Sequence, residues 1–269
     1  MFSKQVSNSR APAVAGQFYP ADPAQLQAML QDMFSTARPI RLSHIKALVV
    51  PHAGLIYSGP VAASAYQAIA DQADQIRRVV LLGPSHRVGF HGIATVSASE
   101  YLMPMGRVRI DQAAIERISA LPQVVQLDEA HASEHSLEVQ LPFLQAVLND
   151  FLLVPLVVGD CPPGQVAEVL ELLWGGDETL IVISSDLSHY HSYDEARAQD
   201  RQTSQAIIHL QPENIGYEDA CGRNPLNGLL LAAKTHGLKA QLIDLRNSGD
   251  TAGPRDRVVG YGAYAFVDE

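Results

Sequence analysis

The chain has 269 residues, 47% of them hydrophobic, which is enough to bury a sizeable core. Its formal net charge of −10 repels phosphate backbones and anionic lipid, so we expect no nucleic-acid partner and no membrane partner. No apolar run reaches the roughly 20 residues of a membrane span, and the N-terminal residues lack the apolar core of a signal peptide, so a cytoplasmic location is expected.

The first half of the chain alternates between apolar runs and helical patterns. Residues 45–50 (IKALVV) predict a buried strand that ends at a proline. Residues 58–70 predict a helix with Pro60 at its first position, where no backbone donor is needed. Residues 134–148 predict a further helix with Ser133 as its cap.

The second half continues the alternation. Residues 164–176 predict a helix, and residues 224–237 predict another, with Asn224 as its cap and Gly237 at its end. Residues 258–267 show an alternating pattern, so we expect this last strand at a sheet edge with one wet face. The remaining predicted strands are 77–83, 151–159, 179–184 and 239–245.

Strands that are apolar throughout and are separated by helices indicate an α/β fold. Its central sheet is expected to be mainly parallel and flanked by helices on both faces. No repeat, low-complexity tract or flexible linker divides the chain, so we expect one domain over residues 1–269. In such sheets the ligand site lies beyond the carboxyl ends of the strands.

Three histidines occupy equivalent places, each just after a predicted strand: His52, His86 and His189. A parallel sheet brings such loops to one rim, and imidazole suits metal binding and proton transfer near neutral pH. Asp186 precedes His189 by three residues. It either orients an imidazole as a neighbouring carboxylate or closes a turn after the strand.

The two cysteines fit a reducing compartment and no disulfide framework. Cys221 lies just before a predicted helix, where the positive helix end and the nearby Arg223 favour a thiolate. A thiolate there is able to bind a metal or to act as a nucleophile, although a buried structural cysteine is the commoner case. Cys161, in a turn-like stretch, is expected to be an inert small hydrophobe.

Residues 131–135 (HASEH) match H-x-x-E-H, a protease signature that needs both histidines on one helix face. Because Ser133 resembles a helix cap, we expect His131 in the preceding loop, which argues against a protease. If His135 and Glu138 are helical, they share a face and either reach the pocket or pair on the surface. Glycine-rich phosphate-binding patterns are absent after the predicted strands, so nucleotide binding is not expected.

Several motifs stand in a fixed order along the chain. They are RAPAVAGQFYPADP, PHAGLIYSGPVAASAY, LLGPSH, EHSLEVQLPFL, ISSDLSHY and CGRNPLNGLLL. This ordered set resembles the Memo family (mediator of ErbB2-driven cell motility), which has many bacterial and archaeal members, and the match spans nearly the whole chain. The resemblance implies a fold similar to class III (LigB-type) extradiol dioxygenases, which hold non-haem iron.

The resemblance also implies roles for particular residues. His52, His86 and Cys221 would be the metal ligands. His189 would match the acid/base histidine of the dioxygenases, and Asp186 would line the same pocket. His135 would also approach the site.

This chain differs from the dioxygenases at one position and from the animal Memo proteins at another, and these differences limit which functions the resemblance implies. Cys221 takes the place of a carboxylate, and sulfur shifts metal preference toward copper or zinc, so the catechol-cleaving reaction does not follow from the fold. Iron or copper is the expected ion, with zinc as a further candidate. Animal members have a Trp-Tyr pair where this chain has Phe18 and Tyr19, for which we expect simple packing of the N-terminal arm.

Three hypotheses for function remain open from the sequence. The first is a metal-dependent oxidoreductase related to the extradiol dioxygenases, in which His189 moves a proton. The second is a non-catalytic binding or accessory module, with an unknown small-molecule or peptide ligand, that partners a radical-SAM protein. The third is a metal store.

Overall fold

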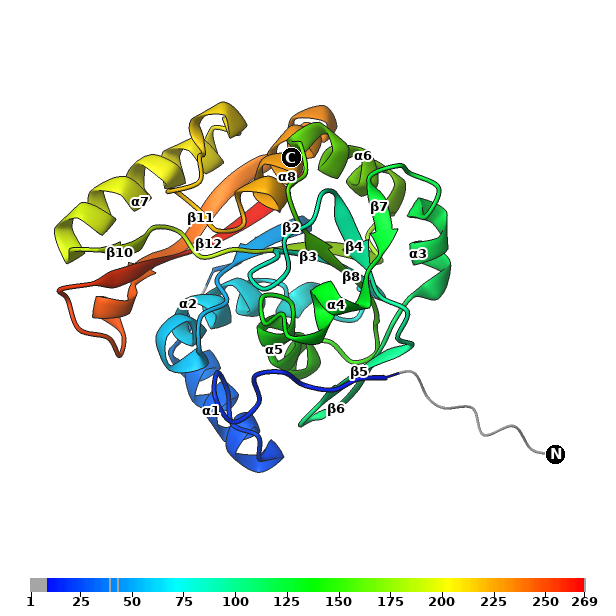
Figure 1. Ribbon diagram of the computed structural model, residues 1–269. Coiled ribbons are helices and arrows are strands. Elements are labelled where there is room, and N and C mark those ends of the chain that lie inside the picture. Colours follow the sequence, from blue (N-terminus) through cyan, green and yellow to red (C-terminus); the bar gives the residue numbers. More distant parts are fainter. Residues whose placement is uncertain (1–8, 39, 43, 269) are drawn as a thin grey trace.

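The computed structural model describes residues 9–38, 40–42 and 44–268, and a twisted sheet runs through its centre (Figure 1). The strands of this sheet are β2 (Ile45–Val50), β3 (Arg78–Pro84), β4 (Ile93–Thr95), β7 (Val124–Gln126), β8 (Leu152–Val158), β9 (Thr179–Ser184), β10 (His189–His191), β11 (Lys239–Asn247) and β12 (Val258–Val267). Their order across the sheet is β10-β12-β2-β9-β3-β8-β4-β7, and β11 also pairs with β12.

The centre of the sheet is parallel. β2, β9, β3 and β8 lie side by side in the same direction, and nearly all of their residues are buried. Continuous apolar strands of this kind need cover on both faces, which the helices supply. The prediction of an α/β fold with a mainly parallel central sheet is therefore confirmed.

The helices lie above and below the sheet (Figure 1). On one face, α2 packs against α1 and α5, and on the other face α6 packs against α8. The α-helices are α1 (Pro23–Thr36), α2 (Leu55–Ala68), α3 (Gln112–Ile118), α4 (Asp128–Ala132), α5 (Leu141–Val147), α6 (Pro163–Leu173), α7 (Tyr193–Ile208) and α8 (Arg223–His236). Short 3₁₀ turns span Ala70–Gln72, Glu138–Gln140, Pro212–Asn214 and Ser248–Asp250.

A small second sheet holds the N-terminal arm. It has the order β1 (Ser9–Arg10), β5 (Glu100–Met103), β6 (Gly106–Arg109). β1 pairs with β5 in parallel, so the start of the described chain is tied to a hairpin about ninety residues away in sequence. These strands are too short and too polar for hydrophobic periodicity to reveal them.

The prediction that residues 258–267 form an edge strand is wrong. β12 lies inside the sheet and pairs with three strands, namely β11 along most of its length, β10 at its start and β2 at its end. The small residues of its alternating pattern are glycine and alanine, which let neighbouring elements pack closely against β12. They do not indicate a solvent-exposed face. A Cβ on Gly260, for example, would lie 2.0 Å from the Asp200 Oδ2 atom on α7.

Two predicted helix starts differ from the structure. α2 begins at Leu55, after Gly54, so Pro60 lies inside the helix and costs it one backbone hydrogen bond. α8 begins at Arg223, and the side chain of Asn224 does not cap it but donates to the Gly159 carbonyl at 2.8 Å. Gly237 ends α8 in the left-handed conformation, as predicted.

The predicted helix over residues 134–148 is also too long. Only the last part, α5, is α-helical, and it follows the 3₁₀ turn Glu138–Gln140. The Glu134 carboxylate accepts from the backbone amides of His135 and Ser136, at 2.9 and 2.8 Å, and so closes a turn where the helix was expected to begin. His131, expected in a loop, lies in the short helix α4.

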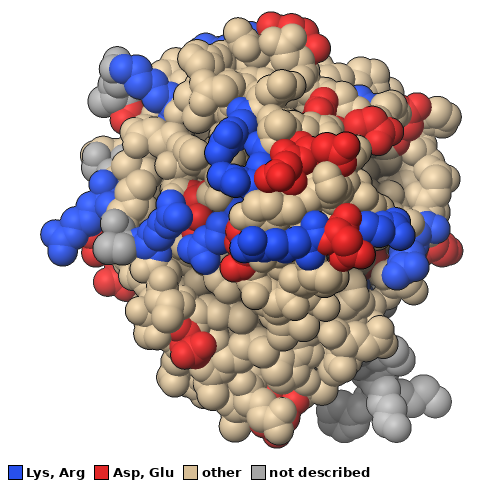
Figure 2. Space-filling view, turned by 90° about the vertical axis from the view of Figure 1, so that its left-hand side faces the viewer, with Lys and Arg blue, Asp and Glu red and all other residues tan. Residues whose placement is uncertain are grey.

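The face that carries α7 and the β11–β12 hairpin, on the left of Figure 1, has charges of both signs. Figure 2 shows Lys and Arg side chains in a band across this face, with Asp and Glu side chains beside and within the band. The buried Asp244 carboxylate pairs with Arg246 at 2.6 Å and with Arg38 at 3.6 Å. In the described part of the chain, no helix has the length and apolar character needed to cross a bilayer.

Candidate metal centre

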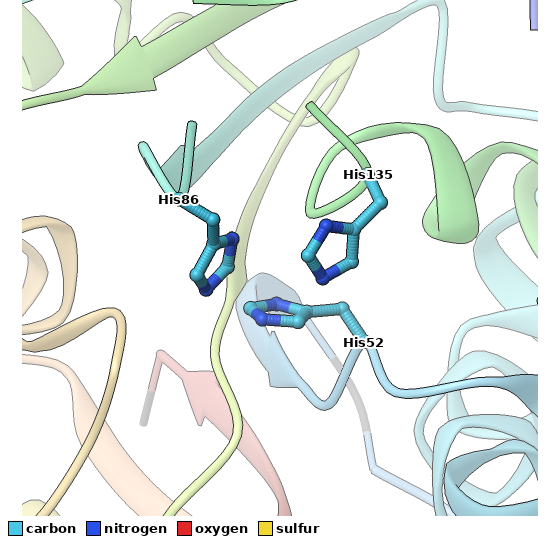
Figure 3. Close-up of side chains that lie close together, drawn as sticks. All are labelled: His52, His86 and His135. Atoms are coloured by element: carbon cyan, nitrogen blue, oxygen red, sulfur yellow. The ribbon is translucent and has the colours of Figure 1, made fainter. Parts of the chain in front are cut away.

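Three histidines from separate segments converge at the carboxyl ends of β2 and β3. Figure 3 shows the rings of His52, His86 and His135 turned toward one another, and one nitrogen from each lies within 4.8 Å of the other two. The ring centroids of His52 and His86 are 5.1 Å apart, and those of His86 and His135 are 4.6 Å apart. Imidazole nitrogens at such separations are able to share one ion.

The hydrogen bonds around His52 select its tautomer. Ser184, the last residue of β9, donates its hydroxyl proton to the Ser136 carbonyl at 2.6 Å and accepts from Gln140 Nε2 at 2.7 Å. The same hydroxyl lies 2.9 Å from His52 Nδ1. Because its only proton is already donated, it accepts from His52 Nδ1–H. The lone pair of His52 is therefore on Nε2, which faces the cluster.

The buried carboxylate of Glu134 selects the tautomer of His86. Glu134 Oε1 lies 2.9 Å from His86 Nδ1, and Glu134 Oε2 accepts from the His86 backbone amide at 2.6 Å. Burial by itself would raise the pKa of Glu134, but the hydrogen bonds and charge of His86 and the Ser136 amide lower it to about 2. An ionised carboxylate holds the proton of His86 on Nδ1 and leaves Nε2 free for a metal.

His135 completes the cluster from the opposite side. Its Nδ1 atom is buried without a hydrogen-bond partner and lies 3.4 Å from Glu134 Oε1. The ring of Phe18 packs against it, with 4.8 Å between ring centroids. Burial lowers the pKa of His135, and it lowers the pKa of His52 well below the usual value. Both imidazoles are therefore neutral near pH 7, which is the form that binds metal.

Cys221 reaches the cluster from the segment before α8. Its Sγ atom lies 3.4 Å from His52 Nε2, and its backbone amide donates to the Asp186 carbonyl at 3.3 Å. Burial, followed by the negative charge of Asp186, raises the pKa of the Cys221 thiol. The amide of Gly222 at the helix end lowers this pKa, as expected, but burial and Asp186 outweigh it, so the protein groups alone favour the thiol. The Arg223 guanidinium lies over the Tyr217 ring, 3.2 Å from its centroid.

Asp186 and His189 lie beside the cluster, and their side chains hydrogen-bond to backbone groups of the loops. The Asp186 carboxylate accepts from the His52 backbone amide at 2.7 Å. Burial raises the pKa of this carboxyl. The His189 ring is held by its own loop, with Nδ1 2.8 Å from the Leu187 carbonyl. Its charge is close enough to contribute to the lowered pKa of His52.

The protease interpretation of residues 131–135 finds no support in the geometry. Both ring nitrogens of the buried His131 are engaged, with Tyr101 Oη at 2.8 Å and the Ala94 carbonyl at 3.0 Å. His131 therefore has no free lone pair for a metal. Burial lowers its pKa to about 4.

Glu138 faces away from the cluster and binds the N-terminal arm. Its carboxylate pairs with the Arg10 guanidinium, accepts from the Tyr19 hydroxyl, and accepts from the backbone amides of Ala13 and Val14 at 2.7 and 3.0 Å. Tyr19 is buried, so its role is packing and anchoring of the arm. The arm in turn places Phe18 beside His135.

Two residues that shape the site were not identified from the sequence. Glu134 was noted only as part of the protease signature, and Ser184 only as the end of a strand. Glu134 is a polar residue beside a predicted helix cap and Ser184 is a polar residue at the end of a strand, and such positions have many local explanations. Their role follows from hydrogen bonds that span 48 residues, from Glu134 to His86, and 132 residues, from Ser184 to His52.

Comparisons with known proteins agree with this architecture. The profile of a family described as Memo-like protein matches residues 10–265. The chain is similar to MEMO1 family proteins of Methanosarcina barkeri (37% identity, 94% of this chain and 98% of the relative) and Ignicoccus hospitalis (36% identity, 96% and 98%). It is also similar to one from Archaeoglobus fulgidus (34% identity, 96% and 99%).

A solved structure is similar in fold alone. The uncharacterized protein JW3007 of Escherichia coli K12 aligns with a TM-score of 0.54 at 13% sequence identity, over 82% of this chain and 99% of that protein.

Proposed function

Because the chain belongs to the Memo family, we propose that it is a metal-dependent oxidoreductase whose ion is held by His52, His86 and Cys221. The observation that carries the proposal is the convergence of three distant loops. It places the Cys221 sulfur 3.4 Å from His52 Nε2, next to three imidazoles whose nitrogens lie within 4.8 Å of one another.

The chemistry of the donor set fits a divalent or redox-active ion. His52 and His86 each offer an Nε2 lone pair, because Ser184 and Glu134 hold the Nδ1 protons. The thiol of Cys221 loses its proton on binding, since a cation offsets the burial and the nearby negative charge that otherwise keep it protonated. Imidazole with thiolate favours copper or zinc over magnesium or calcium and is compatible with iron.

The remaining residues serve proton transfer and orientation. An ion at this place supplies Lewis acidity and, for iron or copper, redox chemistry. His189, half-buried and fixed through Nδ1 by the Leu187 carbonyl, presents Nε2 as the group that takes up or delivers a proton. The Asp186 carboxylate holds the His52 backbone in place, and His135 covers the side of the cluster under Phe18.

Metal analysis of protein prepared without a histidine tag and without air tests the ligand set. We expect about one ion per chain, lost in His52→Ala and Cys221→Ala. Cys161→Ala and His209→Ala are matched controls, since Cys161 lies in another turn and His209 is exposed at the end of α7. Metal content unchanged in His52→Ala and Cys221→Ala would overturn the proposal. Loss in His52→Ala and His135→Ala, but not in Cys221→Ala, would move the third ligand from sulfur to imidazole.

Oxygen consumption separates an enzyme from a metal-holding module. With the metal-loaded protein and a panel of reduced aromatic substrates, the proposal expects uptake that falls in His189→Ala while metal content stays constant. The open side of the cluster, where the His86 side chain is 28% exposed, also suits a metal store or an accessory protein of a radical-SAM system. Rapid metal loss to a chelator without oxygen uptake would favour the store, and a stable protein complex without uptake would favour the accessory role.

A further inference from the structure

A cavity of about 450 Å³ opens beside Cys221, between the loop after β3 and the segment that leads into α8. Three chain segments form its walls: two follow the carboxyl ends of β3 and β8, and the third leads into the first turn of α8. The lining residues that matter for its chemistry are Val88, Gly89, Phe90, Tyr217, Cys221 and Pro225.

The cavity and the histidine cluster share a residue. Cys221 lines the cavity while its sulfur lies 3.4 Å from His52 Nε2. On the other wall, Ser85 lines the cavity directly before His86 in the chain. A molecule seated in the cavity therefore approaches the cluster from the side of the sulfur.

The walls are apolar and aromatic. Phe90 and Tyr217 offer ring surfaces, and Val88 and Pro225 add aliphatic surface. Tyr217 is 73% exposed, so core packing does not hold it. The Arg223 guanidinium lies over its ring instead, 3.2 Å from the centroid. The Tyr217 ring at the rim of the cavity is therefore already held in position before any ligand binds.

The charges near the cavity disfavour an anionic occupant. The residues that line it include no lysine, arginine or glutamate, and the Asp160 carboxylate, 3.2 Å from His91 Nδ1, is largely solvent-exposed. A carboxylate or phosphate would lose hydration against these apolar walls, and the guanidinium beside the cavity, that of Arg223, already lies over the Tyr217 ring. An uncharged ring would exchange water for apolar and aromatic contact.

We propose that this cavity binds a small, flat, uncharged ring compound and delivers it to the metal centre. The inference rests on the proposed function, for which it names the class of ligand. Volume agrees with this class, since 450 Å³ falls in the range of small-molecule sites and exceeds a single bicyclic ring.

A cavity-filling variant tests the proposal. A Cβ added at Gly89 would meet no atom within 4 Å, so Gly89→Trp can place an indole in the cavity without a backbone clash. Gly164→Trp is the matched control, because a Cβ there also meets nothing within 4 Å and Gly164 lies on α6, outside the cavity lining. Tyr217→Leu, at an exposed position, is a second variant that removes one ring wall.

The probe is 5-fluoroindole, a neutral ring without metal-chelating oxygens, followed by fluorine NMR relaxation. We expect binding to wild type and Gly164→Trp, and affinity weaker by about tenfold or more for Gly89→Trp and by a smaller factor for Tyr217→Leu. 5-Fluoroindole-2-carboxylate should bind metal-free wild type about tenfold more weakly than the neutral probe does, and metal-free protein is used because a bound ion would itself attract the carboxylate.

Undiminished probe binding in both Gly89→Trp and Tyr217→Leu would overturn the inference, as would a carboxylate that binds as well as the neutral ring. Metal titration of the same proteins keeps the two proposals apart. Gly89→Trp should bind metal as wild type does. A wild-type protein that binds the probe in this cavity but no metal would refute the proposed function and leave the cavity as a binding site.

Discussion

At the scale of single residues, two hydrogen bonds prepare the cluster. Ser184 and Glu134 hold the Nδ1 protons of His52 and His86, so both rings point an Nε2 lone pair toward the same space. Neither residue would touch a metal. Each acts by fixing the tautomer and the orientation of a ligand, which commonly accounts for a large part of metal affinity.

Glu134→Gln tests this positioning role. The amide of glutamine would present N–H toward a His86 N–H, which disfavours the present tautomer. We expect metal affinity to fall on the order of 10- to 100-fold, measured by titration calorimetry with Zn²⁺ or Co²⁺. Glu171→Gln, at a partly exposed carboxylate paired with His236, is the control. Equal affinity in Glu134→Gln and wild type would contradict the role.

At the scale of elements, one carboxylate ties the N-terminal arm to the turn before α5. Glu138 is fully buried and binds Arg10, Tyr19 and two backbone amides of the arm. The same arm carries Phe18 onto His135. The 3₁₀ turn that begins at Glu138 therefore links the stability of the N-terminal arm to the geometry of the histidine cluster.

Glu138→Gln should destabilise the fold. It leaves the Arg10 guanidinium, whose side chain is 6% exposed, without its counter-charge. We expect the free energy of unfolding to drop by about 3 kcal/mol, measured by urea denaturation. Glu171→Gln should change it by less than about 0.5 kcal/mol. A similar small change in both variants would show that the buried pair contributes little.

His131 joins α4 to β4 and β5 and makes stability depend on pH. Its pKa falls from 6.5 in an unfolded chain to about 4 in the fold, so the unfolded state binds the proton more readily. The stability contributed by the neutral ring is present above pH 6.5 and is lost as the pH falls toward 4. At 1.36 kcal/mol per pH unit this loss amounts to about 3 kcal/mol.

The measurement is unfolding by urea at several pH values. His131→Gln, although less stable at pH 7, should lose less stability than wild type between pH 6.5 and pH 4, because the titrating group is gone. The exposed His209→Gln should keep the wild-type slope. If the slopes of His131→Gln and wild type coincide, His131 is not the group responsible.

At the scale of the whole molecule, acidic side chains accompany the band of Lys and Arg side chains on the face shown in Figure 2. The net charge is −10, and the buried Asp244 carboxylate pairs with both Arg38 and Arg246. Binding to a phosphate backbone needs several unpaired cations in a row, because affinity grows with the number of phosphates neutralised.

We therefore predict no binding to duplex DNA at physiological salt. An electrophoretic mobility assay should show a dissociation constant weaker than about 10⁻⁴ M, the weak end of ordinary non-specific binding. DNA binding that is tighter than this and weakens steeply with salt would show that the band of Lys and Arg side chains in Figure 2 is a functional surface. Arg246→Gln would then serve to locate it.

The sequence determined the fold class and the loops that hold the site. Apolar runs such as Ile45–Val50 are long enough and β-branched enough to be strands whatever surrounds them, and a parallel sheet brings the loops after such strands to one edge. His52 and His86 could therefore be selected by type and position, whereas His135 and Cys221 were assigned to the site through the resemblance to the Memo family.

Only the tertiary structure decided how these residues meet. It placed His135 against His52 and His86, directed Asp186 to the His52 backbone, and buried Cys221 so that its thiol holds its proton. It also put β12 inside the sheet. Hydrophobic pattern is a local property of the chain, whereas tautomer, protonation and ligand distance depend on partners that lie up to 169 residues apart, as in the contact of Cys221 with His52.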